Sequence, residues 1–292
     1  MRRPAFARIA VLFAAFFTAQ ALSACSRLVS VDPLAAGLPA SHEQWGGAYT
    51  TTLKGDKGGG LPMLLRLMPR GDGAYDFTIH SRGPGKDIFA GSGALDLIGR
   101  GEVRLADLGE GYAVAQTRCE IAVSADASLP VERRTMADMM EIARRFGALS
   151  KNVPHSNYLG PFVYALVRGG PARPETIVGI DSLTAVTEAA QGTSVDVDKW
   201  EGGVGDGMLL GSGLVFESDD IHIANHGGTA TIQPFFARLA KELFSAKEVG
   251  NLVSWDRVAP ERLSALRYSN RFPPAGEIGG WCNLLAAMPK DK

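Results

Sequence analysis

Apolar and polar residues alternate along much of the stretch between Trp45 and about residue 124. Glycine-rich segments, such as those at 55–60 and 99–101, interrupt the alternation at short intervals. A period of two places successive side chains on opposite faces of a strand, so the pattern predicts an antiparallel meander of short strands. The apolar face of this predicted meander comprises Leu61, Met63, Leu65, Leu67, Tyr75, Phe77, Ile79, Val103, Leu105, Cys119, Ile121 and Val123.

Two other stretches have helical spacing. Within 130–149 the apolar positions are rich in Met and recur every three or four residues, with Thr135 and Gly147 as start and stop residues. A second helix is predicted where Ile232, Phe235, Phe236, Leu239 and Leu243 recur, and Pro234 is expected in its first turn. Both stretches are amphipathic, which predicts that each helix packs on a neighbouring layer through one face.

The remaining patterns are shorter. Asp72-Gly73 predicts a type I′ hairpin, because Gly tolerates a positive φ. The glycine-rich run 192–213 predicts a long loop. Short strands are predicted at 161–168, 175–181, 214–216 and 221–223, and short helices at 185–191 and 260–267. The fold class that follows is α+β, an antiparallel β-meander with two main amphipathic helices packed on it. A closed β-barrel-like body with helices is the alternative.

The N-terminus has the pattern of an export signal. Arg2, Arg3 and Arg8 precede a nine-residue apolar run, which is too short to cross a bilayer. Small residues and the tetrad Leu22-Ser23-Ala24-Cys25 follow. This arrangement resembles the signal peptide and lipobox of bacterial lipoproteins. The resemblance covers residues 1–26 only, and no family is recognised for the rest of the chain.

The lipoprotein resemblance implies how the N-terminus matures. The leader would be cut before Cys25, whose thiol would carry a diacylglycerol, with palmitate as a typical acyl group. Ser26, where an Asp would signal retention in the inner membrane, implies the outer membrane, facing the periplasm. We therefore expect three regions: a signal peptide at 1–24, a lipidated N-terminus and tether at 25–44, and a globular body at 45–292. The body has a possible subdomain boundary near 150–160.

Composition limits the partners of this 292-residue chain. It has 30 Lys and Arg against 31 Asp and Glu, which gives no basic footprint for nucleic acid. Removal of residues 1–24, which hold three Arg and no acids, leaves a formal charge of −4. The expected partners are the membrane, through the lipid anchor, and other envelope proteins or peptidoglycan. No apolar stretch after the leader reaches the ~18 residues of a membrane span.

The cysteine count suggests a disulfide. Three Cys are present, and lipidation of Cys25 would leave Cys119 and Cys282 as an even pair. Export would place both in an oxidising compartment, where disulfides persist. A Cys119–Cys282 bridge would tie the C-terminal tail to the meander, although two separately buried thiols are the alternative.

Signals for catalysis are weak. His222, His226 and Asp220 are weak metal-ligand candidates, and a polar strand face that runs into a turn explains them better, so no metal site is expected. The serines lie in no Gly-x-Ser-x-Gly motif. No cofactor is expected. The chain is therefore interpreted as a non-enzymatic binding, scaffolding or assembly module of the cell envelope.

Two alternatives stay open, an envelope hydrolase with a site assembled from distant residues and a carrier of an apolar ligand. A deep pocket with a convergent acid, base and nucleophile would favour the hydrolase, and an apolar cavity would favour the carrier. A flat exposed patch would favour the partner-binding module.

Overall fold

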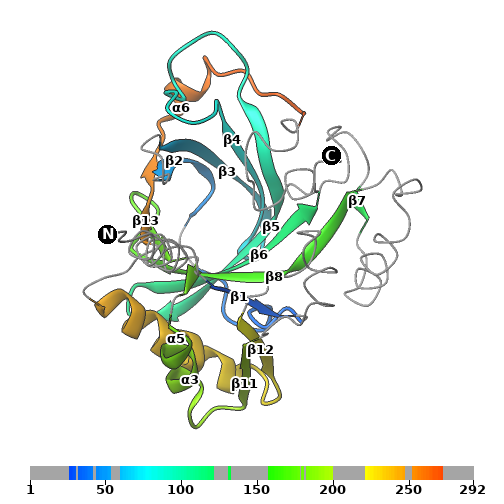
Figure 1. Ribbon diagram of the computed structural model, residues 1–292, viewed down its shortest axis with the longest axis vertical. Helices are drawn as coiled ribbons and strands as arrows, with labels where there is room; N and C mark the ends of the chain where they lie inside the picture. Colours follow the sequence, from blue (N-terminus) through cyan, green and yellow to red (C-terminus); the bar gives the residue numbers. More distant parts are fainter. Residues whose placement is uncertain are drawn as a thin grey trace, which may run out of the picture.

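One large, curved, mixed sheet with three helices makes up the described structure, which is therefore an α+β fold (Figure 1). The computed structural model describes residues 26–30, 32–41, 44–53, 60–121, 131–132, 157–177, 179–180, 182–199, 221–246 and 252–271.

The first half of the sheet is the antiparallel meander that the alternation predicts. Its five strands are β2 (Gly47–Leu53), β3 (Leu61–Gly71), β4 (Ala74–Ser81), β5 (Asp96–Gly109) and β6 (Tyr112–Ile121), each paired with the next. At the β3–β4 turn Asp72 and Gly73 have φ values of 52° and 69°, which confirms the expected hairpin geometry. Glu110 and Gly111 turn the chain from β5 into β6 in the same way, with φ values of 53° and 78°.

Strand β8 (Asn157–Arg168) extends the meander into the second half of the chain. It pairs antiparallel with β6, so strands from the two halves of the chain are neighbours in one sheet. The opposite edge of β8 is shared by two short strands, β1 (Ser26–Ser30) and β9 (Glu175–Ile177). β7 (Val131–Glu132) pairs parallel with the start of β8.

Beyond β1 the sheet becomes mixed. β1 pairs parallel with β12 (Ile221–Asn225), which pairs antiparallel with β11 (Val195–Lys199). The expectation of a loop throughout 192–213 is therefore wrong at β11. The two-residue strand β10 (Gly179–Ile180) pairs with Ser26 and Arg27 at the start of β1.

The convex face of the sheet is covered by helices. α5 (Thr229–Ser245) confirms the predicted amphipathic helix and buries seven apolar side chains, and it contacts β5, β6, β8 and β11. Pro234 is the sixth residue of α5, so its expected place in the first turn is wrong. α3 (Leu183–Ala190) packs beside α5 and is capped by the Ser182 hydroxyl, which accepts from the Ala185 N–H at 3.1 Å.

Two short strands approach the end of the meander. β13 (Leu252–Ser254) pairs with β9, and β14 (Asp256–Arg257) pairs with β2. The β13–β9 ladder has three residue pairs and the β14–β2 ladder has two. The sheet is not closed into a barrel, so the alternative of a closed β-barrel-like body is wrong. α6 (Pro260–Leu263) follows and is shorter than predicted. No helix in the described ranges has the length and apolar character needed to cross a membrane.

The segment expected to be a tether is part of the folded body. Leu28 and Val29 in β1 are fully buried, and Ala40 forms a β-bridge with Ala106. The buried Tyr164 hydroxyl contacts the Ser30 hydroxyl at 2.6 Å and accepts from the Leu34 N–H at 3.0 Å. The tether expectation is therefore wrong for the described residues between 26 and 41, because the short run around Leu28 completes the sheet.

The other predicted amphipathic helix, at 130–149, lies outside the described residues apart from the two residues of β7. The expected strand at 214–216 lies outside them as well.

Candidate functional site

The concave face of the meander encloses an apolar cavity. Its volume is about 140 Å³, and it is partly open to the surface. The apolar side chains predicted to share a face of β3, β4 and β5 all point to this side of the sheet. The lining residues are Trp45, Tyr49, Leu65, Leu67, Phe77, Ile79, Val103, Leu105, Ala115, Thr117, Cys119, Ala165, Val167, Pro174, Thr176 and Trp255.

Small side chains in the middle strands leave the cavity unfilled. Ala115 of β6 pairs directly with Ala165 of β8, and Leu105 of β5 lies on the other side of Ala115. Directly opposed residues on a sheet have Cβ atoms only ~5 Å apart, so two adjacent alanines leave a shallow depression in the concave face. No helix in the described residues fills this depression, because α5 and α3 both pack on the opposite face.

Aromatic side chains also line the cavity, and the polar atoms of Trp45, Tyr49 and Trp255 are already paired. The indole N–H of Trp45 donates to the Ser41 hydroxyl at 2.9 Å, and that of Trp255 donates to the Thr176 hydroxyl at 2.9 Å. The Tyr49 hydroxyl donates to the Trp45 carbonyl at 2.9 Å. Burial raises the pKa of Tyr49 despite the opposing charge of Arg257. The aromatic rings therefore offer apolar surface to an occupant.

No residue among those that line the cavity in the described structure carries a formal charge. An acid and a base that converge with a nucleophile are consequently not found on these walls. Enclosed cavities of similar size lined by aliphatic and aromatic residues bind small apolar molecules, and this partly open pocket offers the same kind of surface. The chemistry that this surface supports is the binding of an apolar group.

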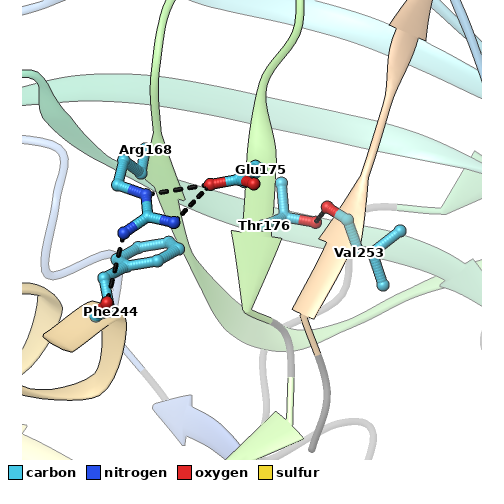
Figure 2. A network of polar contacts seen from close by, with 5 residues as sticks. All are labelled: Arg168, Glu175, Thr176, Phe244 and Val253. Carbon is cyan, nitrogen blue, oxygen red and sulfur yellow. Dashed lines mark hydrogen bonds and ion pairs between the residues drawn. The ribbon is translucent and has the colours of Figure 1, made fainter. Parts of the chain in front are cut away.

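The β9–β13 side of the cavity is braced by a polar network (Figure 2). Arg168, at the end of β8, donates from Nε and Nη2 to one carboxylate oxygen of Glu175, at 2.9 and 2.5 Å. Its Nη1 donates to the Phe244 carbonyl at 3.1 Å, and its guanidinium lies 4.7 Å from the Phe244 ring centroid. A cation at a helix C-terminus is favourable, so Arg168 ties the end of α5 to β9.

The bracing continues from β9 to β13. The Thr176 hydroxyl contacts the Val253 carbonyl at 3.5 Å, in addition to accepting from the Trp255 indole (Figure 2). Because β9 and β13 share only three residue pairs, these side-chain contacts add to a short ladder.

Of the three cysteines, Cys119 lies within the described part of the chain. Cys119 lies on β6 and lines the cavity, whereas Cys282 and the lipidation candidate Cys25 lie outside the described residues. The Cys119–Cys282 bridge therefore stays a prediction.

Two of the three metal-ligand candidates lie within the described residues. His222 lies in β12, while the exposed His226 contacts Asp196 at 3.0 Å between Nε2 and Oδ2. Asp220 lies outside the described residues. In the described part of the chain, no three His, Cys, Asp or Glu side chains gather as a metal site requires.

The cavity itself was missed by the sequence analysis. The alternation of residues identified the apolar face of the sheet. The volume of the cavity, however, depends on which residues pair across neighbouring strands. The signal that points to it is the run of small residues Ala113, Ala115 and Thr117 at alternate positions of β6. Comparison of the chain with models of known families, with curated proteins and with solved structures finds no match.

Proposed function

We propose that this protein is a non-enzymatic, lipid-anchored envelope protein that binds the apolar part of an amphiphile in its concave cavity. The observation that carries the proposal is the uncharged, aromatic and aliphatic lining of that cavity. This lining supports a carrier of an apolar ligand over an envelope hydrolase. It also indicates that the ligand of a binding module would be apolar.

The shape of the cavity supports an amphiphile rather than a wholly apolar molecule. A partly open pocket covers one end of a ligand and leaves the other in water. Since the lining offers no charged partner, a headgroup placed inside would lose its hydration without compensation. The end of the hydrocarbon chain of a fatty acid or phospholipid, with the rest of the chain and the headgroup outside, fits both conditions and the volume of about 140 Å³.

The envelope location rests on the N-terminal signals. The short apolar leader and the lipobox ending at Cys25 support lipidation, and Ser26 supports the outer membrane, facing the periplasm. Two or more acyl chains form a stable anchor. An anchored protein with an apolar cavity would be positioned to receive or deliver acyl chains within the envelope.

One purification tests both parts of the proposal. The protein is isolated from its native envelope after growth with labelled palmitate, and bound lipids are extracted and identified by mass spectrometry. We expect label on the wild type, none on Cys25→Ser, and an amphiphile at near-stoichiometric amount. A labelled protein that carries no extractable amphiphile, and takes up none when offered, would contradict the binding role.

A further inference from the structure

The proposed anchor joins the chain directly at a buried strand. Ser26, the residue after Cys25, already pairs with Ile180 of β10. Two residues later Leu28 is fully buried and pairs with both β8 and β12. Consecutive Cα atoms lie only ~3.8 Å apart, so a lipid on Cys25 would hold this part of the body close to the bilayer.

Two exposed leucines lie near this point. Leu183 begins α3, three residues after Ile180, and Leu252 of β13 pairs with Ile177, three residues before Ile180. Consecutive Cα atoms are ~3.8 Å apart and paired Cα atoms on neighbouring strands ~5 Å apart. The Cα of Ser26 is therefore at most about 16 Å from that of Leu183 and about 22 Å from that of Leu252.

Exposed large apolar side chains are few among the described residues. Leu183 is 38% exposed and Leu252 is 37% exposed, and the third such residue, Met68, is 39% exposed. Met68 lies on β3, five strands from β1 along the sheet. The residues that pair with Met68 in turn across β4, β5, β6 and β8 lead to Ser30. Ser30 is the last residue of β1, whereas the proposed anchor precedes Ser26, the first. Met68 therefore serves as a matched reference.

We propose that the face around the start of β1, the start of α3 and strand β13 rests on the lipid bilayer, with Leu183 and Leu252 in its interfacial region. This inference depends on the lipidation of Cys25 that is part of the proposed function. The formal charge of −4 after loss of the leader gives the body no net attraction to an anionic surface. The contact therefore depends on the anchor and on apolar side chains.

This orientation also explains how an acyl chain would reach the cavity. Thr176 of β9 and Trp255, which follows β13, line the cavity, and the ladder between these two strands is short. With β13 at the membrane, a hydrocarbon chain would pass from the bilayer to the cavity beside this ladder.

Fluorescence quenching tests the membrane face with the full-length lipidated protein. Leu183→Trp, Leu252→Trp and Met68→Trp are each reconstituted into vesicles of phosphatidylcholine brominated on its acyl chains, and the emission of the four native tryptophans is subtracted. We expect quenching of the new emission at 183 and 252, little change between low and high salt, and no quenching at 68.

The controls separate this inference from the proposed function. Absence of palmitate label in the same samples would overturn the anchor and this face together. Labelled protein in which positions 183 and 252 are quenched no more than position 68 would overturn the membrane face alone, and would leave the anchor and the cavity standing.

Discussion

The two faces of the sheet are built from the same strands, but one is tightly packed and the other borders a cavity. On the convex face, alternate residues of β5, β6 and β8 such as Ala106, Val114 and Leu166 are covered by α5 and are almost inaccessible to solvent. On the concave face, the intervening residues such as Leu105, Ala115 and Ala165 surround an unfilled volume.

This difference shows what strand alternation does and does not decide. Strands β5, β6 and β8 place apolar side chains on both faces, yet only one face has an amphipathic helix to complete its packing. On the other face, opposed alanines and hydrogen-bonded tryptophans leave space. The convex face therefore accounts for more of the stability, and the concave face is available for a ligand.

The largest effect expected is on the convex face. Phe236 is fully buried, with its ring centroid 5.1 Å from that of Tyr164. Phe236→Ala should lower the free energy of unfolding by about 3–5 kcal/mol, measured by chemical denaturation. Phe77→Ala, on the concave face, should cost less, because one side of that ring already borders the cavity. An equal or larger loss for Phe77→Ala would contradict the difference between the faces.

A buried imidazole gives the convex face a pH dependence. Burial lowers the pKa of His80 to about 4, assisted by the charge of Arg66, whereas the unfolded chain has the ordinary value near 6.5. Well above pH 6.5 His80 is neutral in both states and contributes no pH dependence. Between pH 6.5 and 4 the unfolded state binds the extra proton, so stability falls as the pH falls, by on the order of 3 kcal/mol in total.

Denaturation of wild type and His80→Leu at pH 7 and pH 4 measures this contribution. The variant should lose less stability over this interval than the wild type does. Equal losses in the two proteins would show that His80 is protonated in the native state and that its site is wetter than described.

The same substitution on the two faces should have different effects. Ala106→Leu adds volume to the packed face and should destabilise the fold by about 1–3 kcal/mol. Ala115→Leu adds the same volume next to the cavity and should leave stability unchanged or raise it slightly. Thermal denaturation of both variants checks the pair, and a larger cost at Ala115 would indicate that the cavity is closed in solution.

The smallest effect is expected at the contact that links the two faces. Arg168→Ala removes the contacts to Glu175 and to the end of α5, and about 1 kcal/mol of stability should be lost, because both side chains of the ion pair are partly exposed. Arg173→Ala breaks the more exposed pair with Asp256 and should have no measurable effect. Hydrogen exchange of β9 amides should rise in Arg168→Ala only.

Local patterns predicted the elements that depend on local chemistry. The alternation over Leu61–Leu67 and Tyr75–Ile79 correctly assigned the residues of the concave face, and Asp72-Gly73 correctly gave the hairpin. α5 was predicted because its apolar spacing spans several turns. In each of these cases a single stretch of sequence contains the information.

The parts that were missed depend on distant partners. β1 is only five residues long and is stabilised by β8 and β12, which lie more than a hundred residues away in the chain, so its sequence looked like part of a tether. The cavity depends on Ala115 meeting Ala165, which the register between β6 and β8 decides. The gap left by two alanines is visible only once that pairing is known.

Ligand titration tests the central claim most directly. A soluble form, with Cys25→Ser behind a cleavable secretory leader, is titrated with a fluorescent fatty acid, and so are its Ala115→Leu and Ala106→Leu variants. The account predicts saturable binding by the soluble form and by Ala106→Leu, and binding about tenfold or more weaker by Ala115→Leu. Binding that is unchanged in Ala115→Leu would show that the fatty acid does not occupy the concave cavity and would contradict the account.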